Sequence, residues 1–259
     1  QLGGRVLIMR DSEIVEQGDA QRVLNQPREA YSQELLGADP AAWDDIEHPA
    51  PGELLISARG LAKSFPPLTL FTDLHVDLHA GERVALLAPS GTGKTTLGNV
   101  LLGLQSADSG SIRYAPQLKY GSMQKLYQDP VTAFAPRLTL RQAFEDLCRR
   151  HRFDFEAVRP FLERLRLPFL LLDRLPAQVS GGELQRLALI RALLLKPKVV
   201  FADEPTSRLD PVTQKDTFRC LLEELKAAGC ALLLVTHDKA LATKTAHRTL
   251  TLAPLAQPG

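Results

Sequence analysis

An apolar segment that runs directly into a glycine-rich turn limits this chain to few folds. Residues 83–87 are largely apolar, and they lead into Ala88-Pro89-Ser90-Gly91-Thr92-Gly93-Lys94-Thr95-Thr96. A turn with this spacing wraps phosphate groups with its backbone N–H groups, and its lysine reaches the terminal phosphate oxygens. The turn needs a strand before it and a helix after it, because a helix N-terminus attracts anions. The sequence therefore predicts a strand over residues 83–87 and a helix over residues 95–104.

A second segment supplies carboxylates for the same site. Residues 199–202 are apolar and predict a buried strand, and Asp203 and Glu204 follow them directly. Beside a phosphate-binding turn, the first carboxylate suits a Mg²⁺ ion, and the second suits the terminal phosphate and its attacking water. The pair predicts a nucleotide site with Asp203 at the metal and Glu204 as the base.

A third segment predicts another anion site. Ser180, Gly181 and Gly182 precede Glu183, near the start of a helix predicted over residues 184–195. Serine and glycine at a helix start provide N–H groups for an anion. One nucleotide needs only one such anion site, so the second site is expected to face a nucleotide held by a partner copy. This arrangement predicts a head-to-tail dimer with ATP between the two halves.

Short apolar segments alternate with helices through most of the chain. Further strands are expected over residues 54–58, 74–79, 125–127, 231–236 and 248–252, and a further long helix over residues 212–227. Wholly apolar short strands between helices indicate a parallel sheet that is covered on both faces. The leucine- and arginine-rich stretch 138–172 predicts an inserted helical subdomain.

One predicted strand carries a row of possible metal ligands. His75, Asp77 and His79 alternate with apolar residues, so their side chains are expected on one face of that strand. We interpret this face as a solvated strand surface, and a metal site is the alternative.

The order of these motifs resembles the ATP-binding domain of ABC transporters. Residues 179–193 are similar to the signature motif of that family and the helix after it, and residues 127–130 are similar to its Q-loop. Residues 207–210 are similar to the D-loop, and residues 236–238 to the switch-histidine loop. The resemblance covers residues 53–252. It implies an α/β fold: a P-loop NTPase (RecA-like) core with a parallel sheet, an N-terminal antiparallel β subdomain and an inserted α-helical subdomain.

The resemblance also implies a role for each matching residue, with ATP and Mg²⁺ as cofactors. The expected catalytic residues are Glu204, His237 and Gln128, and the expected metal residues are Thr95, Gln128 and Asp203. Gln128 is also expected to couple the site to a membrane subunit. The expected nucleotide contacts are Phe65 on adenine; Ser90, Gly91, Thr92, Gly93, Lys94, Thr95 and Thr96 on the phosphates; and Ser180, Gly181, Gly182, Glu183 and Asp210 in the signature and D-loop motifs.

The first 52 residues resemble the end of one domain followed by a connection. Residues 1–37 predict two strands and two short helices, and they are similar to the C-terminal tail of an oligopeptide, dipeptide or nickel importer ATPase. Residues 38–52 hold three prolines and four acidic residues, which predicts a linker, with Trp43 as a local packing anchor. Residues 53–259 predict a complete ABC-type ATP-binding domain. The simplest interpretation is the C-terminal half of a tandem ATPase.

Three departures from the family pattern have physical consequences. Ala88 replaces the usual first glycine of the phosphate-binding turn, and its methyl group is harmless only where φ is negative. Arg208 replaces a small residue of the D-loop, which affects coupling between the two ATP sites. The sequence also ends soon after Leu252, without the tail that this branch carries.

Composition limits the kinds of partner. The chain has 31 Lys and Arg against 30 Asp and Glu, so it lacks the basic excess of a nucleic-acid-binding domain, and no nucleic-acid partner is expected. Its three cysteines form no CxxC pair and are expected to be buried thiols. The longest uninterrupted apolar run, residues 231–235, is far shorter than the roughly 18 residues that span a bilayer. A membrane role would therefore require partner subunits.

The sequence thus predicts an ATPase that powers solute uptake, of peptide, nickel or metal-chelate type, at the cytoplasmic face of a bacterial inner membrane. The expected partners are transmembrane permease subunits, a second ATPase domain and, indirectly, a periplasmic solute-binding protein. One alternative is a soluble ABC ATPase of translation or DNA repair, which the short proline-rich linker and the absence of a long coiled-coil insertion disfavour. Another is a degenerate ATP-binding regulatory module, which the intact Lys94, Asp203, Glu204 and His237 disfavour.

Overall fold

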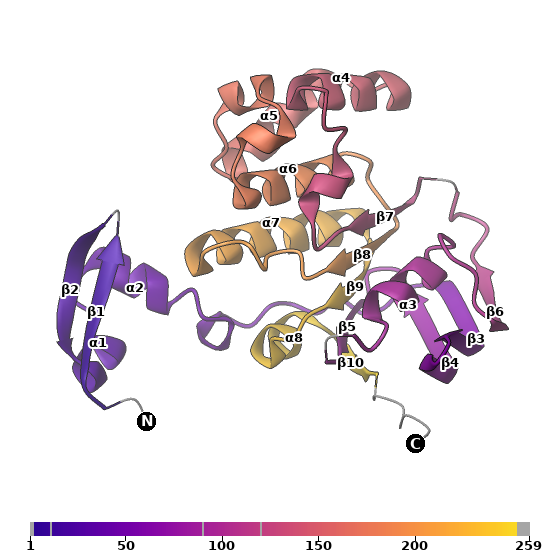
Figure 1. The fold of residues 1–259 in the computed structure, drawn as a ribbon, viewed down its shortest axis with the longest axis horizontal. Helices are drawn as coiled ribbons and strands as arrows, with labels where there is room; N and C mark the ends of the chain where they lie inside the picture. Colours follow the sequence, from indigo (N-terminus) through magenta and orange to yellow (C-terminus); the bar gives the residue numbers. More distant parts are fainter. Residues whose placement is uncertain (1–2, 11, 90, 120, 253–259) are drawn as a thin grey trace.

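The computed structural model describes residues 3–10, 12–89, 91–119 and 121–252. An N-terminal unit stands apart from the rest of the molecule (Figure 1). It contains strands β1 (Arg5–Arg10) and β2 (Glu13–Asp19) and helices α1 (Ala20–Asn25) and α2 (Ala30–Leu36). The strands pair antiparallel, and the unit has the two strands and two short helices that the sequence predicts. Asp19 caps α1, because its carboxylate accepts the Gln21 N–H at 2.9 Å.

The central sheet has five parallel strands in the order β10-β5-β9-β8-β7. These strands are β5 (Arg83–Leu87), β7 (Met123–Leu126), β8 (Val199–Asp203), β9 (Ala231–Val235) and β10 (Arg248–Thr251). Every residue of β8 and β9 is buried. This agrees with the prediction of a parallel sheet covered on both faces, and it explains why these strands are continuous apolar runs.

Alternate residues of each central strand enter two different cores. Phe201 packs with Leu97 of α3 (Lys94–Leu101), on the face that also meets the antiparallel sheet. Val200 and Ala202 pack with helices α6 (Gly181–Leu193), α7 (Pro211–Ala228) and α8 (Lys239–Thr245) on the opposite face. The expected helix at 95–104 begins one residue earlier and ends at Leu101.

The antiparallel β subdomain is a three-stranded sheet in the order β4-β3-β6. Its strands are β3 (Leu54–Phe65), β4 (Leu68–His79) and β6 (Ser109–Tyr114). The sequence predicted only parts of β3 and β4, and it missed β6, because β6 is polar, glycine-containing and largely exposed. On β4, Asp77 pairs with Arg59 at 2.7 Å, and the interpretation as a solvated face is favoured. Within the described ranges no cluster of His, Cys, Asp and Glu could hold a metal ion.

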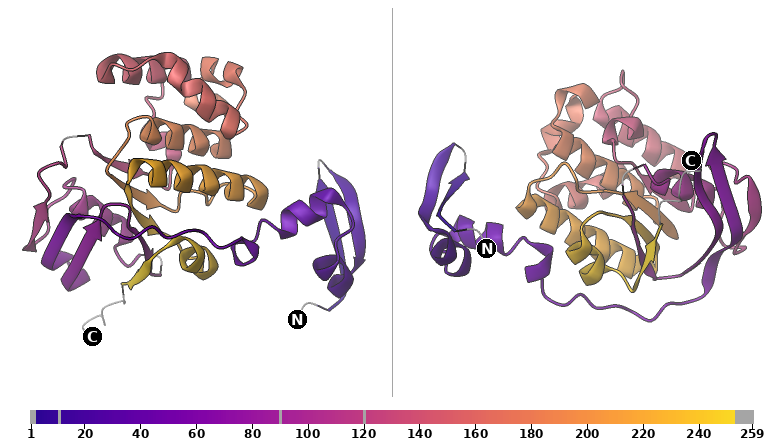
Figure 2. Two further views of the ribbon diagram at one scale, coloured as in Figure 1. Left: turned by 180° about the vertical axis from the view of Figure 1, so that it is seen from behind. Right: turned by 60° about the horizontal axis from the view of Figure 1, so that its bottom comes forward.

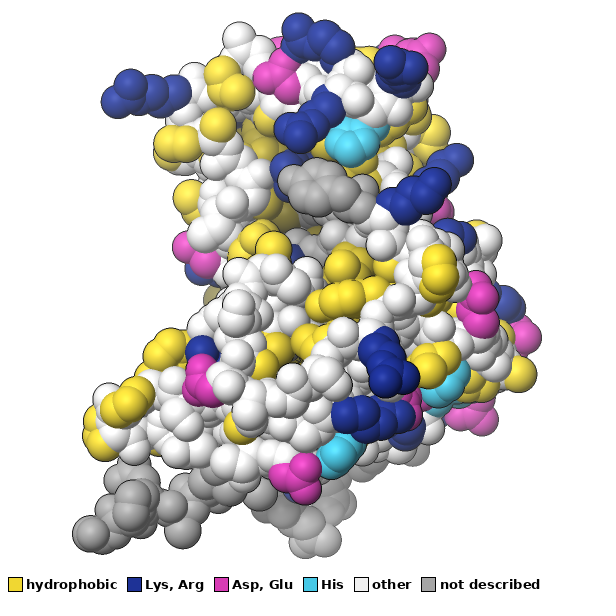
Figure 3. All heavy atoms as spheres, turned by 90° about the vertical axis from the view of Figure 1, so that its right-hand side faces the viewer, with side chains coloured by type: hydrophobic (Ala, Val, Ile, Leu, Met, Phe, Trp, Pro, Cys, Tyr) yellow, Lys and Arg dark blue, Asp and Glu magenta, His cyan; other side chains and the backbone are white. Residues whose placement is uncertain are grey.

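The inserted helical subdomain lies beyond β7 in the sequence. It contains α4 (Leu140–His151), α5 (Arg159–Arg164) and α6, joined by short 3₁₀ turns: Pro130–Ala133, Phe155–Val158, Phe169–Asp173 and Pro176–Gln178. Thr139 and Gln142 form a capping box that fixes the start of α4. Viewed toward β6, the molecule narrows between this subdomain and the sheets (Figure 3).

The segment 38–52, which we call the strap, lies against α7 and the central sheet, although the sequence predicts a linker there. It begins with a 3₁₀ turn over Pro40–Ala42 and then runs past α7 toward the sheet (Figure 2). The Trp43 side chain is only 7 % exposed, and its ring packs 6.1 Å from the Phe218 ring of α7. Its indole N–H donates to the Ala38 carbonyl at 2.9 Å. Trp43 is thus a packing anchor that joins the strap to the main core.

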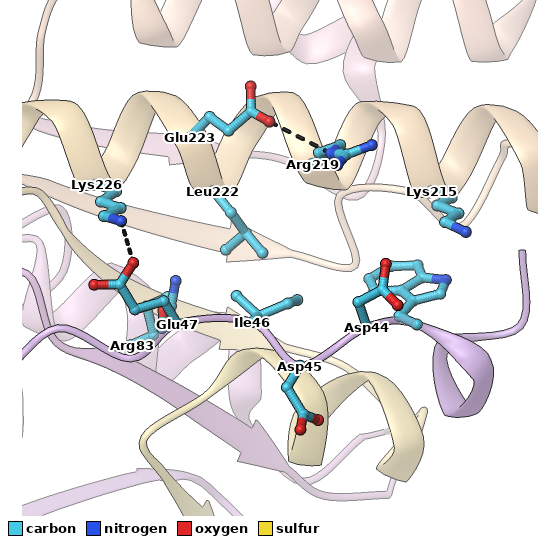
Figure 4. Close-up of a pocket in the computed structure, with 11 residues that line it drawn as sticks. Asp44, Asp45, Ile46, Glu47, Arg83, Lys215, Arg219, Leu222, Glu223 and Lys226 are labelled. Carbon is cyan, nitrogen blue, oxygen red and sulfur yellow. Dashed lines mark hydrogen bonds and ion pairs between the residues drawn. The ribbon is translucent and has the colours of Figure 1, made fainter.

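Polar contacts hold the rest of the strap. Glu47 pairs with Lys226 at 2.5 Å, and Asp45 pairs with Lys244 at 2.9 Å. Ile46 points toward Leu222 in a cavity of roughly 290 Å³ between the strap and α7 (Figure 4). These contacts place the strap along α7 and α8.

A half-buried histidine joins the strap to the sheet. His247 Nδ1 accepts the backbone N–H of Arg83 at 3.0 Å, so its Nε2–H donates to the Pro49 carbonyl at 2.7 Å. The Arg83 guanidinium donates to the Glu47 carbonyl at 2.6 Å. Arg83 and His247 lie at the amino ends of β5 and β10, and the strap therefore covers the amino edge of the parallel sheet.

Candidate nucleotide-binding site

The glycine-rich turn connects β5 to α3 at the carboxyl edge of the sheet. Gly91 and Gly93 have φ values of +80° and +89°, which residues with side chains adopt only at a cost. Lys94 lies across the turn and donates to the carbonyls of Ala88 at 2.8 Å and Pro89 at 2.7 Å. The Lys94 ammonium therefore fills the turn by bonding to its backbone carbonyls. It lies where the sequence predicts the phosphates of a nucleotide.

Two side chains whose oxygen atoms can bind a metal ion meet at the start of α3. The Thr95 hydroxyl donates to Asp203 Oδ2 at 2.5 Å, although the two residues are 108 positions apart. Asp203 is 4 % exposed and ends β8 beside the turn. Hydroxyl and carboxylate oxygens are hard ligands, which suits Mg²⁺. The residues present therefore fit the expected metal.

Glu204 lies beside this pair and is held from both sides. Gln128 Nε2 donates to Glu204 Oε2 at 3.4 Å, and His237 Nδ1 lies 3.3 Å from Glu204 Oε1. The backbone of Glu204 has φ +46°, a left-handed conformation that costs about 1 kcal/mol for a residue with a side chain. Its N–H donates to the Val235 carbonyl at 3.0 Å, which fixes that conformation. The structure thus brings together the three residues predicted to be catalytic.

A cleft of roughly 350 Å³ lies between the glycine-rich turn and Glu204, and His237 is not one of the residues that line it. Phe65 stands at its edge with 48 % of its surface exposed, where it is free to stack on a flat ring. The lining residues are Phe65, Leu70, Gly91, Gly93, Lys94, Thr95, Thr96, Gln128, Asp203 and Glu204. Thr92 lies in the same turn, and its hydroxyl donates to the Pro89 carbonyl at 2.8 Å. Ser90, also predicted as a phosphate contact, lies outside the described residues.

The signature residues do not line this cleft. Ser180 Oγ accepts the Glu183 N–H at 3.2 Å, and Glu183 Oε2 accepts the Ser180 N–H at 2.7 Å. This capping box leaves the Ser180 hydroxyl proton free for another acceptor. Asp210 similarly caps α7 by accepting the Thr213 N–H at 3.0 Å. Their separation from the cleft is compatible with the expected contact to a second nucleotide.

The family follows from comparison with known proteins. A model of the family described as "ABC transporter" matches residues 71–207, which is more than half of the chain. The chain belongs to the ABC transporter family. This confirms the resemblance drawn from the motifs and the expected class, an ABC-type ATPase domain.

Relatives and solved structures agree with this assignment. Glutathione import ATP-binding protein GsiA of Salmonella typhimurium strain LT2 is 31% identical over 299 residues, covering 95% of this chain and 48% of the relative. The ABC transporter ATP-binding protein YejF of Escherichia coli K12 is 30% identical over 280 residues, covering 97% and 53%. The chain thus spans about half the length of these two relatives.

The fold is that of solved ABC cassettes. A structure of an ATP-binding subunit of an ABC transporter superposes with a TM-score of 0.67 at 25% identity, over 76% of this chain and 85% of that chain. The cassette MJ0796 bound to ADP and Pi gives the same TM-score at 23% identity, over 76% and 94%. These matches confirm the predicted fold class. Across the described ranges, no helix has the length and apolar character needed to cross a bilayer.

The two departures from the ABC pattern that lie within described residues have local explanations. Ala88 is not in the positive-φ region, so its methyl group is compatible with the turn. Arg208 pairs with Asp129 of the Q-loop at 3.3 Å, and its N–H donates to the Gln185 side chain at 3.3 Å. The same Gln185 amide donates to the Glu204 carbonyl at 3.3 Å. Arg208 therefore links the D-loop to the Q-loop within one ABC domain.

Sequence reasoning missed three residues at the site. Leu70 comes so close to the turn that a Cβ on Gly93 would lie 2.9 Å from the Leu70 Cβ. Gln185 joins α6 to Glu204, and Lys125 lies within β7 behind Asp203. A lysine within a predicted strand was the signal for Lys125, whereas nothing local distinguishes Leu70 or Gln185.

Proposed function

We propose that this chain hydrolyses ATP in the cleft between the glycine-rich turn and Glu204, and that hydrolysis powers solute import. The observation that carries the proposal is the contact between Thr95 and Asp203 at 2.5 Å, with Glu204 next to it. A hydroxyl and two carboxylates thus lie at one helix N-terminus, which supports Asp203 as a metal ligand and Glu204 as a base. That combination is the one that phosphoryl transfer requires.

The residues would divide the work as follows. Lys94 exchanges the carbonyls of Ala88 and Pro89 for β- and γ-phosphate oxygens, while Phe65 stacks on the adenine. Thr95, Asp203 and Gln128 would hold Mg²⁺, which when bound neutralises charge on the phosphate oxygens. Glu204 accepts a proton from the attacking water.

Gln128 and His237 then keep Glu204 in place. Their contacts to the two different carboxylate oxygens leave little freedom for the side chain to rotate. His237 is otherwise largely exposed, so it is free to contact the γ-phosphate once nucleotide is present. The arrangement supports in-line attack with the base already oriented.

A second copy of the domain completes the site in this proposal. Ser180, Gly181 and Gly182 would contact the ATP held by the opposite domain, with the free Ser180 hydroxyl proton as a donor. Asp210 would act at the same interface. The double-length relatives support a second ATPase domain in the same polypeptide, with residues 1–37 as the tail of that domain, 38–52 as the connection and 53–259 as the ATP-binding domain.

The import function rests on the relatives. GsiA is named for glutathione import, which favours peptide-like solutes over nickel or metal chelates for this chain. Transmembrane permease subunits would then be the direct partners, and a periplasmic solute-binding protein an indirect one. The ATPase would act at the cytoplasmic face of a bacterial inner membrane.

The test is Glu204→Gln, with the exposed Glu53→Gln as a matched control. We expect a fall in ATP turnover of at least about 100-fold, the lower end of the usual contribution of a general base, with retained ATP affinity. Turnover is measured by phosphate release and affinity with a fluorescent ATP analogue. Normal turnover in Glu204→Gln would remove Glu204 from the mechanism, and absence of nucleotide binding in the parent protein would remove the proposal itself.

A further inference from the structure

A half-buried lysine lies on β7, the strand next to the one that ends in Asp203, and has no part in the mechanism above. Lys125 is in β7, where it aligns with Phe201 of β8. Its ammonium donates to Asn99 Oδ1 of α3 at 2.6 Å. It also lies 4.7 Å from the centre of the Tyr127 ring and 5.7 Å from the centre of the Phe201 ring. The charge is therefore held by one amide and two aromatic faces, which suits a cation.

The alignment of the strands puts this charge on the same face of the sheet as Asp203. Paired residues of neighbouring parallel strands point to the same face, and so do residues two apart on one strand. Lys125 pairs with Phe201, and Asp203 is two residues further along β8. The contact to Asn99 confirms that this is the face covered by α3, the helix that the glycine-rich turn begins.

Burial and the Asp203 carboxylate act on the pKa of this ammonium in opposite directions. Burial lowers the pKa of Lys125 from its ordinary value of 10.5, and the negative charge of Asp203 opposes that change. The pKa direction agrees with the geometry, since Asp203 is the charge that favours the ammonium.

We propose that Lys125 is a positioning residue whose positive charge, set behind Asp203, favours the free triphosphate over its magnesium complex. The inference rests on the proposed function, because it requires ATP in the cleft. ATP without metal carries about two more negative charges than its magnesium complex, so a nearby cation attracts it more strongly. Lys125 thereby reduces the dependence of ATP affinity on Mg²⁺.

The matched substitution is Lys125→Met, because methionine keeps an unbranched stem between the Tyr127 and Phe201 rings and removes the charge. We expect ATP affinity measured in EDTA to fall about threefold to tenfold, and ATP affinity in saturating Mg²⁺ to fall about twofold or less. The dissociation constant in EDTA divided by the dissociation constant in Mg²⁺ should therefore rise several-fold. Both constants come from equilibrium titration with ATP, monitored by calorimetry.

Two controls separate charge from packing. Lys125→Arg retains the charge and should keep the ratio near that of the parent protein. Lys198→Met removes an exposed lysine that precedes β8 at its opposite end, and it should change neither constant. A purely structural role of Lys125 would weaken both constants equally, so an unchanged ratio in Lys125→Met overturns the inference.

The same titrations distinguish this inference from the proposed function. Should the parent protein fail to bind ATP in either condition, the proposed function fails and the inference with it. If the parent binds ATP and only the ratio is insensitive to Lys125→Met, the inference alone is wrong. If Lys125→Met does not fold, Lys125→Gln is titrated in its place. An unchanged ratio in that variant again contradicts the inference.

Discussion

The two edges of the parallel sheet are built in different ways. At the carboxyl edge, the cleft is made from strand ends and the turns that follow them, as Lys94 follows β5 and Glu204 follows β8. At the amino edge, the strap is held by partners far along the chain, such as Lys226 for Glu47. The carboxyl edge is thus encoded locally, whereas the amino edge depends on tertiary packing. The difference implies that substitutions at the carboxyl edge can change nucleotide affinity without changing stability. Substitutions in the strap can change the free energy of unfolding without changing nucleotide affinity.

The largest separate effect is expected at the strap. Trp43→Ala removes a buried ring that packs on Phe218, and such truncations cost about 3 kcal/mol in the free energy of unfolding. Chemical denaturation followed by circular dichroism measures this change. Nucleotide affinity of the folded variant should stay within about twofold, since no strap residue lines the cleft.

Asp44→Ala is the matched control, because Asp44 is the exposed neighbour of Trp43. It should leave the unfolding midpoint nearly unchanged. A Trp43→Ala protein as stable as the parent would show that the strap is a loose connection after all.

The second effect is expected at the cleft and should leave the strap intact. Lys94→Ala removes the ammonium from the proposed phosphate site, and a hydrogen bond to a charged group contributes about 2 kcal/mol, or roughly 30-fold in affinity. Trp43 is the only tryptophan of the chain, so its fluorescence emission reports whether the strap stays docked. The emission of Lys94→Ala should match that of the parent.

Lys239→Ala provides the corresponding control, since Lys239 is exposed at the start of α8. Its nucleotide affinity should equal that of the parent. A Lys94→Ala change that also shifted the Trp43 emission would show that the two edges are coupled.

The same contrast explains what the sequence could and could not predict. Lys94, Thr95, Asp203 and Glu204 were found because each stands directly after an apolar strand or within one short motif, and the structure brings them together. Their chemical roles, like the division of the chain into three parts, stay predictions. The parallel strands and the helices α6 and α7 were predicted for the same local reason.

What escaped prediction depends on distant partners. Strand β6 is polar and exposed, so no periodic pattern marks it, and its pairing with β3 supplies the order. The strap has the prolines and acids of a linker, and it is held by partners far along the chain, such as Phe218, Lys226 and Lys244. Lys125 could not be assigned without knowing which face of β7 meets α3.

A smaller effect is expected from a single exposed ion pair of the strap. Lys226→Ala removes the partner of Glu47 but leaves Trp43 buried. Exposed pairs contribute little because water screens them. We expect faster hydrogen exchange of the strap amides, with an unfolding midpoint close to that of the parent. Exchange as fast as in an unfolded peptide would mean that the polar contacts, and not Trp43, hold the strap.

The smallest effect is a dependence of the strap on pH. Burial, followed by the charges of Arg83 and His247, lowers the pKa of His48 from 6.5, so the folded strap favours the neutral imidazole. Stability should therefore begin to fall as the pH drops below 6.5. The pKa of Asp45 and that of Glu47 are lowered from 3.8 and 4.5 by hydrogen bonds and charge from Lys244 and Lys226, respectively. Their contribution is present above those values and is lost as the pH falls further.

Two small steps in the free energy of unfolding, measured from denaturation curves of the Trp43 emission, are therefore expected as the pH falls, with the first removed by His48→Gln and the second by Asp45→Asn combined with Glu47→Gln. Since His48 and both carboxylates belong to the strap, ATP affinity between pH 7 and pH 5.5 should not follow the first step. The contrary result is a fall in ATP affinity together with the first step, with both changes abolished by His48→Gln. That result would show that the amino edge of the sheet controls the carboxyl edge, and that the two edges are not independent.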